Sequence, residues 1–211
     1  DDFKSIVSFI NKKDTGRMTV SVMGEMDTAR STHILNRGVY DQPTDAVKPA
    51  ALTSVMPFDT AQFPRNRLGL AKWTVSKDNP LTARVFVNQL WQEFFGRGIV
   101  KTAGDFGMQG NLPSHPELLD WLAVDFMEHN WDIKYLVKKI LLSSTYRQSS
   151  KVSEKQLRID PENIYLSRSP RTRVKAEFIR DIVLGSSGLL NGEIGGPSVK
   201  PYQPAGLWHE L

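Results

Sequence analysis

The stretch NPLTARVFVNQLWQEFFGRG, residues 79–98, indicates an amphipathic helix and with it a helical domain. Asn79 can accept hydrogen bonds from a first helical turn, and Pro80 tolerates that turn because its missing N–H group is not needed there. The glycines of GRG at 96–98 are typical of a helix end. On a helix that advances about 100° per residue, the apolar side chains form one broad face. That face consists of Ala83, Phe86, Val87, Leu90 and Phe94.

Two polar residues, Arg84 and Asn88, lie four positions apart within this apolar sequence. They share a narrow stripe with Trp91 and Phe95 at the edge of the apolar face, so we expect both at the boundary between core and solvent. An arginine there can pack its stem on apolar neighbours while its guanidinium meets water or a carboxylate. The stripe is either a seam against another element or part of a polar site.

The remaining pattern predicts a mainly α fold with a small β-strand or hairpin element near the N-terminus and long irregular connections rich in Pro and Gly. Alternating apolar residues predict a strand within 17–26, and THILNRG at 32–38 is a second extended candidate. Four prolines between 39 and 64 predict an irregular connection, because proline lacks a backbone donor. We therefore expect an N-terminal segment, 1–64, and a helical domain, 65–211.

Further helices are expected from apolar residues at helical spacing. They cover 1–13, 65–75, 114–130, 132–148 and 173–190. Ser114 and Glu117 have the spacing of a capping box, and Asp132 can cap the helix that follows it. In the helix from residue 132, the apolar residues form one stripe with lysines on the opposite side.

Composition excludes several classes of function. With 40% hydrophobic and 24% charged residues the chain is typical of a globular protein, and its net charge of +4 comes from both signs mixed, so nucleic acid is not expected as a partner. No apolar run approaches the roughly 20 residues that a membrane span needs. The absence of cysteine excludes disulfides, thiolate metal sites and covalent c-type haem attachment within this chain.

No familiar catalytic signature is present, so catalytic residues stay unassigned and we expect no cofactor. The four histidines are scattered, which argues against a metal site. The glycine-rich loop GDFGMQGN, 104–111, is either a tight connection or a ligand loop between two helices. The candidate ligand-binding residues near this loop are Arg84, Asn88, Asp105 and His115. For His115, at a predicted helix start, the simpler role is local packing.

Several segments together resemble one family, the planctomycete-type domain of unknown function 1553. They are THILNRGVYDQP, the block from Asn66 to Ala123, STYRQSS, RVKAEFIRD and GGPSV, and the resemblance covers about residues 18–211. It implies a large exported protein with a second uncharacterised domain and, in many members, a cytochrome c-like domain. It also implies an extracytoplasmic location and a domain that continues beyond residue 211. It assigns no catalytic residues.

The favoured interpretation is a non-catalytic module of an exported protein that binds a partner or a ligand such as a glycan. Partners would be other domains of the same polypeptide, a cytochrome c-like protein or a polysaccharide. The alternative is an extracytoplasmic enzyme, hydrolytic or redox-linked, with a pocket near the 104–115 loop. A third interpretation is a fragment of a larger fold. Convergence of the four candidate residues around a pocket would favour a site.

Overall fold

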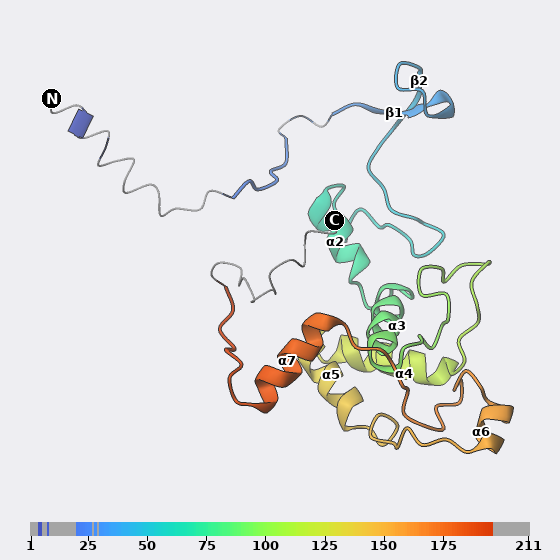
Figure 1. Cartoon of the computed structure of the whole chain (residues 1–211). Helices are drawn as coiled ribbons and strands as arrows, with labels where there is room; N and C mark the ends of the chain where they lie inside the picture. Colours follow the sequence, from blue (N-terminus) through green and yellow to red (C-terminus); the bar gives the residue numbers. More distant parts are fainter. Residues whose placement is uncertain (1–3, 6–7, 9–19, 27, 29, 196–211) are drawn as a thin grey trace, which may run out of the picture. The chain divides into compact units, whose positions relative to one another are not determined.

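The fold is mainly α, as the sequence predicts. The computed structural model describes residues 4–5, 8, 20–26, 28 and 30–195 (Figure 1). Its helices in this part of the chain are α2 (Arg67–Thr74), α3 (Thr82–Phe95), α4 (Pro116–Glu128), α5 (Ile133–Leu142), α6 (Glu154–Ile159) and α7 (Ala176–Ser186). None of these described helices has the length and hydropathy needed to cross a membrane.

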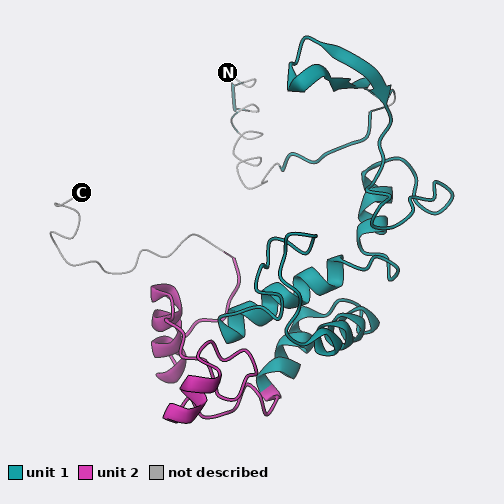
Figure 2. Cartoon of the chain, turned by 90° about the vertical axis from the view of Figure 1, so that its right-hand side faces the viewer, with its two compact units in different colours: residues 1–141 teal, residues 142–211 magenta. Residues whose placement is uncertain are grey.

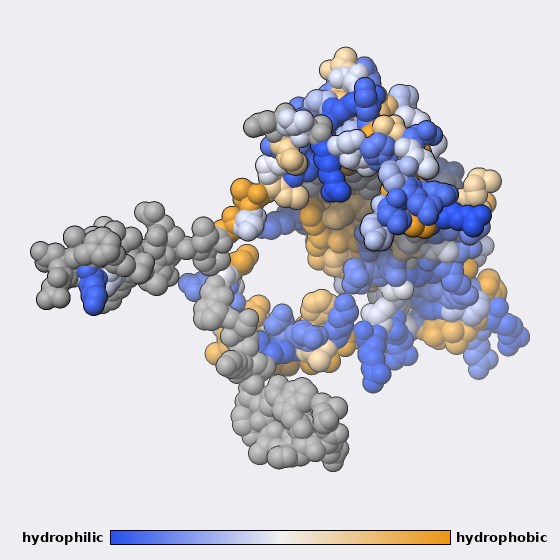
Figure 3. Space-filling view, turned by 90° about the horizontal axis from the view of Figure 1, so that it is seen from above, coloured by the Kyte–Doolittle hydropathy of each residue, from blue (hydrophilic) through white to orange (hydrophobic). Residues whose placement is uncertain are grey.

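Two compact units make up the chain, residues 1–141 and 142–211 (Figure 2). The expected boundary at residue 65 separates stretches of different sequence character, and it stays a prediction. The face seen in Figure 3 carries hydrophilic and hydrophobic residues side by side.

A small antiparallel hairpin lies near the N-terminus, as predicted. It pairs β1 (Thr32–Leu35) with β2 (Pro43–Val47) and has the short 3-10 helix η1 (Asn36–Gly38) between them. The prediction of an irregular connection from 39 to 64 is therefore wrong for β2, because Pro43 is the first residue of its strand, where a missing donor is tolerated.

The strand predicted within 17–26 does not form over 20–26, where the backbone is irregular and the side chains are exposed. Among the described residues these alternating valines and methionines have no neighbouring strand, and an alternating pattern forms a strand only when it pairs with another. Residues 17–19 and most of the helix expected over 1–13 lie outside the described residues.

The core of the first unit lies between α3 and α4, which pack on each other. Phe126 of α4 is buried, stacks on Phe86 at 5.2 Å between ring centroids and meets Trp131 edge-on at the same distance. The buried residues of α3 are Ala83, Val87, Asn88, Trp91 and Phe95. The buried face of α3 is thus shifted from the predicted apolar face toward the stripe that holds Asn88, because Trp91 and Phe95 of that stripe are buried in the core.

Helix starts differ from the predicted ones in detail. α3 begins at Thr82, and the Asn79 side chain accepts hydrogen bonds from the N–H groups of Leu81 (3.0 Å) and Thr82 (3.3 Å). The capping box predicted at Ser114 is wrong: α4 begins at Pro116, and the Ser114 hydroxyl donates to the Ile99 carbonyl instead.

The C-terminal end of α3 and the start of α5 agree with the sequence prediction. Gly96 ends α3 in the left-handed conformation with φ 72°, which glycine adopts without steric cost. The Asp132 carboxylate caps α5 by accepting from the N–H of Tyr135 at 3.1 Å.

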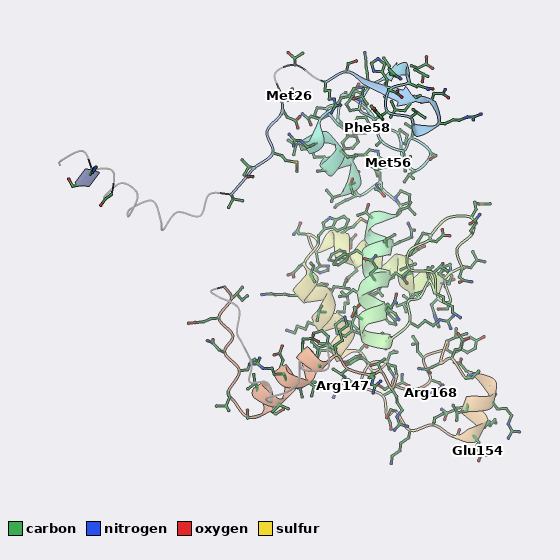
Figure 4. The ribbon with its side chains drawn as sticks, turned by 45° about the horizontal axis from the view of Figure 1, so that its top comes forward. Met26, Met56, Phe58, Arg147, Glu154 and Arg168 are labelled. Carbon is green, nitrogen blue, oxygen red and sulfur yellow. The ribbon has the colours of Figure 1, made fainter. Side chains whose placement is uncertain are left out.

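The second unit is held by polar contacts around a turn after α6. Asp160 is buried and accepts from the backbone N–H groups of Ile164 and Tyr165, both at 2.8 Å. Arg168, labelled in Figure 4, donates to the Asp160 and Pro161 carbonyls at 3.0 Å. α7 forms where predicted. Its apolar side chains are largely exposed: Phe178, Ile179, Ile182 and Val183 are 52–60% exposed.

Candidate functional site

Asn88 lies in the core and not at its boundary, so that expectation is wrong. It is fully buried, its Nδ2 donates to the Val100 carbonyl at 3.0 Å, and its Oδ1 accepts from the Val100 N–H at 2.8 Å. A side-chain amide offers one donor side and one acceptor side, so it pairs with a backbone residue as a neighbouring strand would. Gly98 lies so close that a Cβ there would come within 2.7 Å of the Asn88 Nδ2. Asn88 therefore ties segment 98–100 to α3.

Arg84 occupies the predicted boundary position. Its side chain is 36% exposed, and its guanidinium forms an ion pair with the Asp120 carboxylate of α4 and a hydrogen bond to the Pro80 carbonyl. These contacts join α4 to the start of α3. They give Arg84 a structural role at the edge of the helix pair.

Asp105 and His115 also have local partners. The Asp105 carboxylate accepts from the Gly107 N–H at 2.8 Å, and its carbonyl accepts from the Thr102 hydroxyl at 2.8 Å. His115 is half-buried, with its Nδ1 3.0 Å from the Ser114 hydroxyl oxygen. The four candidate residues thus form hydrogen bonds with different partners. These hydrogen bonds do not show the four side chains converging on one pocket, which is the arrangement that would favour a common site.

A pocket does open beside the glycine-rich loop, but other residues line it. Its volume is about 440 Å³, and it lies between α3 and the loop at Gly104. Its walls are Phe86, Gln89, Leu90, Gln92, Glu93, Ala103 and Gly104. The three polar side chains are exposed. Their position on the polar side of α3 could be read from the sequence, but the spacing alone gave no sign that a loop would cover this side.

A polar and aromatic cluster between α4 and α5 is a second candidate site, and the sequence did not predict it. The Lys139 Nζ lies 2.7 Å from the Asp125 Oδ1 and 3.0 Å from the Tyr135 hydroxyl, and it sits 4.2 Å above the ring of Trp121. His129 stacks on Tyr135 with ring centroids 3.9 Å apart. The available signal was helical spacing: residues 121 and 125 share one side of α4, with His129 four positions further on at its C-terminal end, and residues 135 and 139 share one side of α5.

Electrostatics keep Lys139 charged in this cluster. Partial desolvation opposes the ammonium form, but hydrogen bonds to the Asp125 carboxylate and the Tyr135 hydroxyl outweigh it and raise the pKa of Lys139 above its ordinary value. Asp125 is nearly buried, with 13% of its side chain exposed. The ammonium is thus committed to these groups, and the cluster acts first as a clamp between two helices. Among the described residues, no group of acidic residues and histidines has the arrangement of a metal site.

Comparison with known protein families gives a match over most of the chain. Residues 66–210 match the family PSD1, described as "Protein of unknown function (DUF1553)". No curated protein and no solved structure matched the chain. Because the matched region spans more than half of the sequence, the chain belongs to the PSD1 family of proteins of unknown function (DUF1553).

Proposed function

We propose that this chain is a non-catalytic binding module of a larger exported protein, and that it binds a glycan in the pocket between α3 and Gly104. The observation that carries this proposal is the pocket lining. Gln89, Gln92 and Glu93 offer amide and carboxylate groups next to the apolar side chains of Phe86 and Leu90.

This combination suits a sugar. A saccharide presents hydroxyl groups around its ring edge and C–H groups on its faces. Amides donate and accept hydrogen bonds with hydroxyls, a carboxylate accepts from them, and an aromatic ring packs against the C–H face. The volume of about 440 Å³ lies within the range of small-molecule pockets.

The number of carboxyl groups that line the pocket favours glycan binding over glycan hydrolysis. Most glycoside hydrolases use two, one on each side of the scissile bond. Among the residues that line this pocket only Glu93 carries a carboxylate. The alternative of a hydrolytic enzyme at this loop therefore has less support than a binding site.

The cellular setting of the proposal rests on the family resemblance. Export with other domains, a cytochrome c-like one among them, would place the module in an extracytoplasmic assembly. A glycan ligand fits that setting because exported proteins meet polysaccharide at the cell surface.

Isothermal titration of the chain with neutral hexasaccharides tests the proposal. Cellohexaose, xylohexaose and laminarihexaose serve as probes, with Gln92→Ala as the test variant and Gln62→Ala, an exposed glutamine outside the pocket, as its control. Loss of one hydrogen bond predicts about three- to tenfold weaker binding for Gln92→Ala. Binding that is equally strong in both variants, or no binding of any probe at millimolar concentration, would contradict a glycan site here.

A further inference from the structure

A second pocket, separate from the proposed glycan site, lies in the first unit. Its volume is about 690 Å³, and it lies between residues 24–26, 30 and 32, the loop at 49–58 and the start of α2. Three arginines contribute to its lining, Arg30, Arg65 and Arg67, against one carboxylate, Glu25. The lining therefore carries a local excess of positive charge.

One of these arginines already binds a carboxylate. The Arg67 Nε lies 2.9 Å from the Glu25 Oε1, and its guanidinium also donates to the Gly24 carbonyl. The hydrogen bond from Arg67, aided by its charge, keeps the pKa of Glu25 below its ordinary value despite some desolvation. Glu25 is thus an ionised group held on the pocket wall.

Neither of the other two arginines has such a partner among the residues that the structure describes. The Arg65 Nη1 reaches only the Pro49 carbonyl, at a long 3.4 Å. Within the described part of the chain, no carboxylate pairs with Arg30 or Arg65. A guanidinium has five N–H donors in a planar fork that matches the geometry of an oxyanion. These two arginines therefore have N–H donors left to bind an oxyanion of a ligand.

Apolar side chains lie beside the arginines. Met26, Phe58 and Leu70 line the same pocket, and in Figure 4 the labelled Met26 and Phe58 lie next to α2 although they come from different segments. Met26 is 73% and Leu70 45% exposed, so apolar surface is available to a ligand. Solvated arginines alone would be an ordinary surface. Their position in a concave site with apolar walls is what points to a ligand.

We propose that this pocket binds a small organic anion, with a carboxylate or sulfate group on Arg30 and Arg65 and an apolar body against Met26, Phe58 and Leu70. Glu25 holds Arg67 and limits the affinity, because its negative charge repels the ligand. Neutralising Glu25 should therefore strengthen binding, whereas neutralising Arg30 or Arg65 should weaken it.

Titration calorimetry with three matched probes tests the proposal on the whole chain. The probes are 2-naphthoate, 2-naphthyl sulfate and the uncharged 2-naphthalenemethanol. We expect both anions to bind at least about tenfold more tightly than the alcohol, and Arg30→Gln or Arg65→Gln to weaken the anions about fivefold each. Glu25→Gln should tighten them. Arg173→Gln, the same change at an exposed arginine of the second unit, is the control and should leave affinity unchanged.

Three outcomes would overturn the site. They are equal affinity for the anions and the alcohol, unchanged affinity in both arginine variants, and no binding of any probe at millimolar concentration. Preference for one of the two anions would identify the oxyanion that the arginines recognise. Weaker binding in an arginine variant could also result from unfolding of that variant. Tighter binding in Glu25→Gln cannot have this cause, because an unfolded variant cannot gain affinity.

Discussion

Replacement of Asn88 by alanine should lower the free energy of unfolding by about 4 kcal/mol. The change removes both hydrogen bonds to Val100, whose own exposed fraction is 2%, so its N–H and C=O groups would be left buried and unpaired. Each unpaired buried group costs about 1–3 kcal/mol. The two together give about 2–6 kcal/mol, and total stability for a domain is only about 5–15 kcal/mol.

Urea unfolding followed by far-ultraviolet circular dichroism measures this loss. Gln89→Ala, one residue along the same helix but exposed, is the control and should change stability by less than about 0.5 kcal/mol. Asn88→Asp should be at least as harmful as Asn88→Ala, because a carboxylate cannot donate to the Val100 carbonyl and a charge would be buried. A loss below about 1 kcal/mol for Asn88→Ala would refute the bridging role of this side chain.

Three further outcomes are expected from the same measurement. Arg84→Met should cost less than about 1 kcal/mol, because its ion pair with Asp120 is partly exposed, and a larger loss would mean a buried role. Lys139→Met should lower the free energy of unfolding below pH 10.5, the ordinary pKa of lysine. Because the pKa of Lys139 is raised in the folded state, the difference in stability between the two proteins should shrink as the pH rises above this value. A difference that stays constant with pH would contradict the clamp. Gly69→Ala should destabilise, since its Cβ would lie 1.8 Å from the Pro64 carbonyl oxygen, whereas Gly185→Ala, with its nearest atom at 3.9 Å, should be neutral or stabilising.

Much of the helical fold could be predicted from local pattern. α5 and α7 form where apolar residues recur at helical spacing, and Gly96 and Asp132 end and begin helices as their chemistry suggests. These features depend on a few neighbouring residues, so sequence contains them directly. The wrong predictions involve distant partners. Within the described part of the chain, residues 20–26 have no strand to pair with, and Ser114 bonds to Ile99 instead of capping its own helix.

The candidate site was harder to predict than the fold. Arg84 was placed correctly because a long side chain at a face edge has few alternatives. Asn88 was not, because only the return of the chain at Gly98 brings Val100 to its amide. The lining of the pocket at Gly104 depends on which side of α3 the loop covers, and helical spacing does not contain that information.

The pairing of Asn88 with Val100 also supplies a reporter of local opening. Val100 lies outside the helices and strands, where backbone amide protons commonly exchange with solvent quickly. Its proton is instead held by a side chain of α3, so it can exchange only when segment 98–100 separates from that helix. In a hydrogen–deuterium exchange experiment this one slow amide would measure the free energy of that separation.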